Sequence, residues 1–301
     1  MRRAVPWFAL ALLCVLLPGR AQAQRGKLKV YISADMEGIA GVVTGDQLGP
    51  TGFEYDRFRE FMTREVAAAI DGAKAAGATE IVVSDSHGNG ESLLIEKLPA
   101  DVRVVRSWPR PLMMMEGIDS TFDAAIFIGY HASSVNPTGV RAHTISSANI
   151  TQVALNGTPM PEAGINAAIA GHFGVPVVMV SGDDAAVAEI QKLLGPIEGA
   201  VVKRAIGFHA AETMTPEAAQ ALIRERARTA LARRASLRPY VLQRPVRLDL
   251  ALKSYRPAEL LAYLPGVTRT GSRSISMTGP TVLDVSKFLE FTTNYNIELQ
   301  P

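Results

Sequence analysis

Short apolar stretches alternate with helical patterns along this chain, and this alternation constrains the fold more than any other feature. The apolar stretches are rich in strand-forming residues and cover residues 28–34, 80–84, 102–105, 124–129 and 175–181. Helical patterns lie between them, for example over residues 55–76 and 162–172. Strands that alternate with helices typically form a parallel sheet covered on both faces. We therefore predict an α/β fold with a mostly parallel sheet flanked by helices.

A second, smaller region is predicted toward the C-terminus. Gly195-Pro196 and Gly199 interrupt the pattern, and Thr215 before Pro216 then predicts the start of a long helix through Arg234. A strand pattern over residues 246–252 follows, with short helices and a hydroxyl-rich stretch beyond it, over residues 268–281. These features predict a larger α/β domain over residues 24–198 and a smaller C-terminal α/β segment over residues 199–301.

The N-terminus has the three parts of a secretory signal peptide. Met1-Arg2-Arg3 is basic, residues 8–17 form an apolar run, and Ala21-Gln22-Ala23 fits an A-x-A cleavage site. The run is too short to span a bilayer, which disfavours the alternative of an N-terminal anchor helix. We expect residues 1–23 to be removed, leaving a periplasmic or secreted protein that begins at Gln24 and has no membrane segment.

Charge and cysteine usage exclude other classes of protein. Removing Arg2, Arg3 and Arg20 lowers the number of Lys and Arg from 31 to 28, against 29 Asp and Glu, so no basic face for nucleic acid is implied. The one cysteine, Cys14, lies in the apolar run, so the mature chain has no thiol. A chain of 301 residues buries enough surface to fold without disulfides or a structural metal. Any bound metal would therefore serve the chemistry.

Residue types that bind metals follow three of the predicted strands. Asp35 and Glu37 follow the first, Asp85 and His87 the second, and His131 the fourth. The carboxyl ends of parallel strands meet at one edge of a sheet, where ligands of open α/β folds bind. Residues two apart in extended chain point the same way, so Asp35 and Glu37 can face one ion together, as can Asp85 and His87.

Carboxylates and imidazoles together form a ligand set suited to zinc, with manganese or cobalt also possible. A carboxylate can bridge two ions, as in two-metal hydrolases, and Glu162 beside the helix pattern is a further candidate ligand. Taken singly, each histidine could be a hydrogen-bonded structural residue, and each aspartate a turn or cap residue. The convergence of several strand ends favours a metal site over these alternatives.

These residues occur in an order and spacing that resemble the zinc-dependent D-aminopeptidases of the DppA type. The resemblance covers nearly all of the mature chain. It is carried by Ser33-Ala34-Asp35-Met36-Glu37-Gly38-Ile39, Ser84-Asp85-Ser86-His87, Gly129-Tyr130-His131-Ala132, Gly139-Val140 with His143, Glu162 with Gly164 and Asn166, and Asp183-Asp184.

The resemblance implies an α/β metallo-aminopeptidase that holds two zinc ions and cleaves short peptides with N-terminal D-amino acids such as D-Ala. The implied ligands are Asp35, Glu37, His87, His131 and Glu162, with Asp35 as the bridging carboxylate. It also implies a homo-oligomer, for instance a decamer, whose sites face an internal space. The signal peptide is a departure, because the best-known members of this family are intracellular.

By the same resemblance, His143 is the catalytic residue. It follows a flexible stretch, residues 133–139, which is typical of a polar residue held over a cleft. In this family the histidine is labelled a nucleophile. An imidazole beside a metal that activates water is better suited to general acid/base catalysis or to a proton shuttle. Two other functions stay open: another periplasmic dinuclear metallohydrolase, such as an amidase or esterase, and a non-catalytic peptide-binding protein.

Overall fold

The computed structural model of the protein describes Met1 and residues 27–295, so the rest of the predicted signal peptide lies outside the described residues. The larger of two sheets has the strand order β3-β2-β1-β4-β7-β8-β9, and every neighbouring pair is parallel except β8 and β9. Its strands are β1 (Leu28–Ala34), β2 (Ala78–Asp85), β3 (Val102–Val105), β4 (Ala124–Tyr130), β7 (Val177–Asp183), β8 (Glu198–Gly207) and β9 (Ala210–Thr213).

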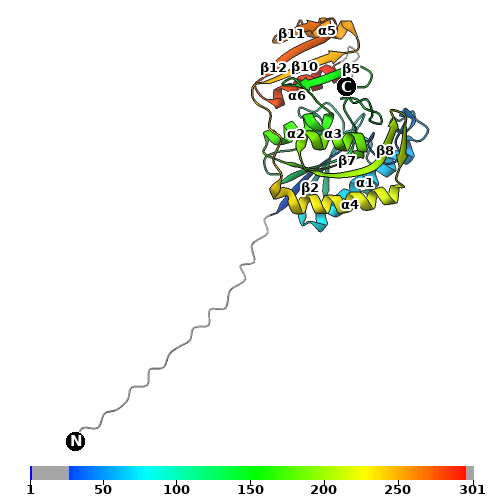
Figure 1. Cartoon of the computed structure of the whole chain (residues 1–301), viewed down its shortest axis with the longest axis vertical. Helices are drawn as coiled ribbons and strands as arrows, with labels where there is room; N and C mark the ends of the chain where they lie inside the picture. Colours follow the sequence, from blue (N-terminus) through cyan, green and yellow to red (C-terminus); the bar gives the residue numbers. More distant parts are fainter. Residues whose placement is uncertain (2–26, 296–301) are drawn as a thin grey trace.

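Four helices cover the two faces of this sheet (Figure 1). α1 (Tyr55–Ala75) and α4 (Pro216–Arg233) pack against each other on one face, with α2 (Glu162–His172) and α3 (Asp184–Leu194) on the other. α1 buries Phe58, Met62 and Val66, which are four residues apart and so share one side of the helix. Gly72 permits the close approach of α1 and α4, because a Cβ atom there would lie 2.3 Å from the Arg224 carbonyl oxygen.

The second sheet is antiparallel and has the strand order β11-β12-β10-β5-β6. α6 packs against β10, β12 and α2, and so lies between this sheet and the larger one (Figure 1). Its N-terminus is a capping box in which Thr281 and Asp284 satisfy each other's backbone N–H groups. The elements are β5 (Ile150–Leu155), β6 (Thr158–Pro159), β10 (Val246–Leu252), α5 (Tyr255–Leu261), β11 (Val267–Gly271), β12 (Ser274–Gly279) and α6 (Val282–Asn294).

The predicted α/β fold with a mostly parallel, helix-flanked sheet is confirmed. The two sheets do not follow the predicted regions. The predicted boundary after residue 198 falls at the start of β8, which belongs to the larger sheet. β5 and β6 lie before that boundary but belong to the second sheet. The hydroxyl-rich stretch forms most of the β11–β12 hairpin. Among residues 27–295, no helix is both long and apolar enough to cross a membrane.

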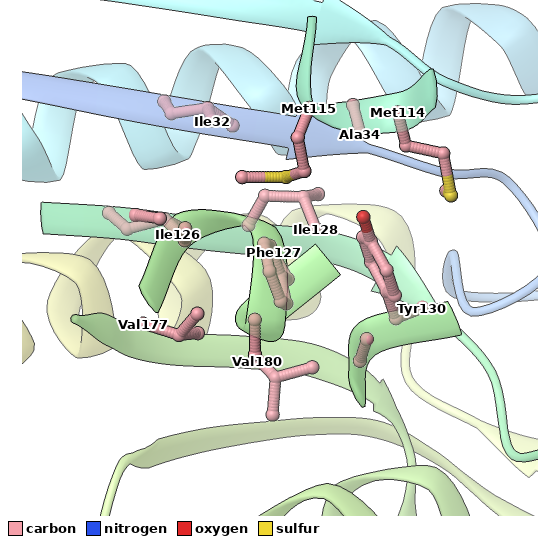
Figure 2. Packing of buried hydrophobic residues seen from close by; sticks show 14 of the residues in the cluster. Ile32, Ala34, Met114, Met115, Ile126, Phe127, Ile128, Tyr130, Val177 and Val180 are labelled. Carbon is pink, nitrogen blue, oxygen red and sulfur yellow. The ribbon is translucent and has the colours of Figure 1, made fainter. Parts of the chain in front are cut away.

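Buried side-chain hydrogen bonds connect β1, β4 and the helix α2 within the core. Figure 2 shows Tyr130 at the end of β4, close to Met114 and to the apolar side chains of β1 and β4. Tyr130 donates to Ser33 Oγ (2.7 Å), and Asn166 Nδ2 of α2 donates to the Tyr130 hydroxyl (2.8 Å). Because such buried hydrogen bonds make the core rigid, they fix the positions of β1, β4 and α2 relative to one another.

Candidate metal centre

The predicted ligands gather at the carboxyl end of the large sheet, where β1 lies between β2 and β4. Asp35 and Glu37 follow β1, His87 follows β2, and His131 follows β4. From β1 the chain continues to β2 and β3 on one side of β1, and then crosses to β4 on the other side. The direction in which strands are added to the sheet therefore reverses at β1. A crevice forms at such a reversal, and it is the usual ligand site of open α/β sheets.

Asp35 lies between two histidines that come from different strands. His87 Nδ1 is 3.3 Å from Asp35 Oδ1 and 3.0 Å from Glu37 Oε2. On the other side, His131 Nε2 is 3.3 Å from Asp35 Oδ2 and 3.3 Å from Glu162 Oε1. The structure thus brings all five predicted ligands together, and each oxygen of Asp35 faces a different group of them.

Backbone carbonyls fix the orientation of each histidine ring. His87 Nε2 donates to Leu48 O (2.7 Å), His131 Nδ1 to Ala132 O (3.0 Å), and His143 Nδ1 to Arg141 O (2.8 Å). Because a carbonyl oxygen only accepts, the nitrogen that contacts it carries the proton. The other nitrogen of each ring is then directed toward the carboxylates. Metal-binding histidines in proteins are held in this way.

The residues present fit a divalent metal ion. Asp35 Oδ2 and His131 Nε2 are both buried and lie 3.3 Å apart, yet neither has a hydrogen-bond partner among the described residues. Two groups each bring three ligand atoms within 4.8 Å of one another: Asp35, Glu37 and His131 form one, and His131, His143 and Glu162 the other. Nitrogen and carboxylate donors in one buried cluster suit zinc.

The buried carboxylates of this cluster favour the binding of positive charge. Burial raises the pKa of Asp35, and the nearby Glu37 carboxylate raises it further. Burial alone would lower the pKa of His87 and of His131, but the carboxylates around each ring outweigh it and raise both pKa values well above the ordinary range. The site therefore stabilises positive charge next to the carboxylates, whether as protons on the rings or as metal ions.

His143 is placed differently from the five predicted ligands. Its ring stacks on that of His131, with 4.0 Å between the ring centroids, and its Nε2 lies 3.7 Å from Glu162 Oε1. Its side chain is 14% exposed, against 1% for His131. His143 is thus the histidine of this cluster that solvent or a substrate reaches most easily.

One supporting residue, Lys203 of β8, is not predicted by the sequence analysis. Its buried Nζ donates to the carbonyl oxygens of Glu37, Ile39 and Val42, so it holds the loop that carries Asp35 and Glu37. The only signal in the sequence is a lysine within an apolar strand pattern, which is equally typical of a strand edge. Sequence reasoning alone therefore gives no reason to place it beneath the site.

Gly38 and Gly129 let the backbones after β1 and at the end of β4 touch. The Gly38 N–H donates to Gly129 O (2.7 Å), and a Cβ atom at Gly38 would lie 2.0 Å from the Tyr130 carbonyl oxygen. Gly129 has a φ of +72°, a conformation that residues with a side chain rarely adopt. The close contact explains why the sequence Asp35-Met36-Glu37 continues with glycine.

Asp85 makes a backbone contact at the end of β2, whereas residue spacing suggests that it could face an ion together with His87. Its Oδ2 accepts from the Leu93 N–H (2.7 Å). β2 ends at Asp85, so the alternation of side chains that holds in a strand does not continue to His87.

A cavity of about 240 Å³ opens beside the metal centre. Glu162 and Ser86 line it, together with apolar residues that include Trp108, Met114 and Ile145. Residues from the C-terminal end of α6 line it as well. A small, partly apolar cavity that shares a carboxylate with the metal centre is suited to a substrate of limited size.

Comparisons with known proteins agree with the geometry. Residues 28–291 match the family model Peptidase_M55, described as D-aminopeptidase. The chain is 34% identical over 259 residues to the D-aminopeptidase of Bacillus subtilis (strain 168), covering 85% of this chain and 93% of that protein. The solved structure of the Zn-dependent D-aminopeptidase DppA from Bacillus subtilis, a self-compartmentalizing protease, superposes with a TM-score of 0.86 at 31% identity, covering 90% of this chain and 99% of that one.

Proposed function

The chain belongs to the D-aminopeptidase family and is a metallo-aminopeptidase, and we propose that it is an exported zinc enzyme that removes N-terminal D-residues, D-Ala among them, from short peptides. One observation carries the proposal: a buried cluster of histidines and carboxylates, with Asp35 at its centre, borders a small cavity. Because a chain of this size folds without a structural metal, we interpret the cluster as a catalytic site.

We assign Asp35, Glu37 and His87 to one zinc site, and Asp35, His131 and Glu162 to the other. The assignment rests on Asp35, whose two oxygens face different histidines. Bound zinc supplies a Lewis acid and lowers the pKa of water, so that a nucleophile forms at neutral pH. The chain itself orients the site through the carbonyl contacts of its histidines and the contacts of Lys203 with the loop after β1.

His143 is proposed as the proton shuttle. Its Nδ1–H donates to Arg141 O, which directs Nε2 toward Glu162, a residue that lines the cavity. From there Nε2 can take a proton from the attacking water and return it to the leaving amine. A shuttle is favoured over a covalent nucleophile because a water molecule activated by bound zinc would serve as the nucleophile.

The size of the cavity supports short peptides as substrates. Its volume of 240 Å³ is below the roughly 300–1,000 Å³ of sites that hold drug-sized ligands. The proposed export, to the periplasm or beyond, is supported by the signal-peptide pattern of residues 1–23. N-terminal sequencing of the protein from its native host tests export: a start at Gln24 is expected, and an intact Met1 in a cytosolic fraction would contradict it.

The substrate is tested by comparing hydrolysis of D-Ala-D-Ala and L-Ala-L-Ala by the zinc-loaded protein. We expect turnover of the D-peptide to exceed that of the L-peptide. Equal rates, or a preference for the L-peptide, would reject D-selectivity and favour a broader metallohydrolase. The Asp35→Ala variant, purified in the same way, is the control for contaminating peptidases, because its turnover should fall with its metal content.

A further inference from the structure

Helix α6 supplies one wall of the cavity beside the metal centre. Glu290, Thr293 and Asn294 line it and are three and four residues apart, so they share one side of the helix. Glu162, a candidate zinc ligand, lines the same cavity. The α6 wall and this candidate ligand thus border the same cavity.

Glu290 places a carboxyl group in this wall. Of the residues that line the cavity, two are carboxylates and none is Lys or Arg. Glu290 is 6% exposed, and its Oε1 accepts the backbone N–H of Arg110 (2.7 Å). Within residues 27–295 it forms no ion pair, because the Arg110 guanidinium donates to Ser84 Oγ (2.8 Å) and to Asp85 O (2.7 Å).

Burial raises the pKa of Glu290, although the N–H and the charge of Arg110 act in the opposite direction. An ammonium group bound beside it would favour the ionised carboxylate and form a charge-assisted hydrogen bond. The other walls suit the rest of such a ligand: Trp108, Met113 and Ile145 offer apolar surface for the methylene groups of an aminoalkyl chain.

We propose that Glu290 determines specificity by binding a second amino group of the substrate, the side-chain ammonium of a basic residue next to the scissile bond. The proposal rests on the aminopeptidase function proposed above. It assigns to α6 a role in selecting substrates, while the metal centre performs the chemistry. Basic dipeptides should accordingly be better substrates than neutral dipeptides of the same length and shape.

The test compares pairs of peptides that differ in one charge. The zinc-loaded enzyme is given D-Ala-D-Lys and D-Ala-D-norleucine, and then D-Lys-D-Ala and D-norleucine-D-Ala, and kcat/KM is measured for each. In at least one pair, the lysine peptide should be favoured roughly 10- to 100-fold, as expected for a buried charge-assisted contact. Glu290→Gln should abolish this preference by lowering kcat/KM for the lysine peptide to that for the norleucine peptide.

Glu290→Gln keeps an oxygen that can accept the Arg110 N–H, so the fold of α6 should be retained. Glu259→Gln, on the exposed side of α5, is the matched control and should keep the preference. Equal rates within both pairs, or a preference that survives Glu290→Gln, would overturn the proposal. Turnover of the norleucine peptides without a lysine preference would overturn the role of Glu290 alone, whereas failure to cleave any D-peptide would reject the aminopeptidase function.

Discussion

Asp35 faces His87 with one carboxylate oxygen and His131 with the other, at 3.3 Å in each case. A ligand placed between two ions serves both, so its loss affects more metal than the loss of a residue at one side. We predict that Asp35→Ala retains less zinc per chain than Glu37→Ala or Glu162→Ala. Elemental analysis of the three purified variants measures this. Retention of about two zinc ions by Asp35→Ala would show that the bridging assignment is wrong.

His143 is expected to affect rate rather than metal content, because it is the more exposed histidine of the stacked pair and lies at the border of the cluster. A positioned acid/base group contributes about 10²- to 10⁴-fold, so His143→Ala should lose that much in kcat and keep its zinc. The two readouts are steady-state kinetics and metal analysis of the same preparation. If zinc is lost together with rate, His143 is a ligand; if the rate is unchanged, it has no part in the mechanism.

At the scale of elements, α1 contacts the loop after β1 through a buried carboxylate. Glu65 Oε1 accepts the Ala40 N–H (3.0 Å), and its other oxygen has no hydrogen-bond partner within residues 27–295. Burial raises the pKa of Glu65 from 4.5 to about 7. Between these two values the folded state holds a proton that the unfolded state has released. The free energy of unfolding that Glu65 contributes therefore falls as the pH rises from 4.5 to 7.

Glu65→Gln removes this titration and keeps an acceptor for the Ala40 N–H. Relative to the wild type, the variant should gain up to about 3 kcal/mol in free energy of unfolding between pH 4.5 and pH 8. Denaturant unfolding of both proteins at the two pH values, with the same zinc concentration, gives the difference. A difference that does not change with pH would contradict the prediction.

Several elements follow directly from local sequence pattern, and others do not. β1, β3 and α2 have the predicted bounds because each is a buried apolar run or a helical pattern with clear ends. β5 and β6 were not predicted. β5 pairs with β6 and with β10, which lies about 90 residues further along the chain. Such a short strand is stable only through its distant partner, so its own residues carry a weak signal.

At the scale of the whole molecule, the antiparallel edge of the large sheet predicts self-association. Ile206, Phe208 and Met214 lie on or beside the β8–β9 hairpin and are 75%, 39% and 40% exposed. β9 is an edge strand, and exposed apolar side chains along such an edge favour pairing with another chain. The Phe208 carbonyl also accepts the Arg141 N–H (3.1 Å), which connects this edge to the loop of His143.

We predict that the protein is a homo-oligomer in solution, as the self-compartmentalizing relative suggests. Light scattering should give a mass many times that of one chain, and Ile206→Glu should lower it by placing charge at the apolar edge. Lys192→Glu, an exposed change on α3, is the control and should leave the mass unaltered. A monomeric wild type would reject the prediction.

The sequence by itself determined the class of fold and which candidate ligands that fold brings to one edge of the sheet. Asp35, Glu37, His87, His131 and Glu162 are recognisable because ligand chemistry depends on residue type, and because the ends of parallel strands meet at one edge. Only the tertiary structure decided which ligand oxygen faces which histidine, that Lys203 supports the loop after β1, and that α6 reaches the cavity. These contacts join residues that are far apart in the chain, and their geometry depends on packing, which no local pattern records.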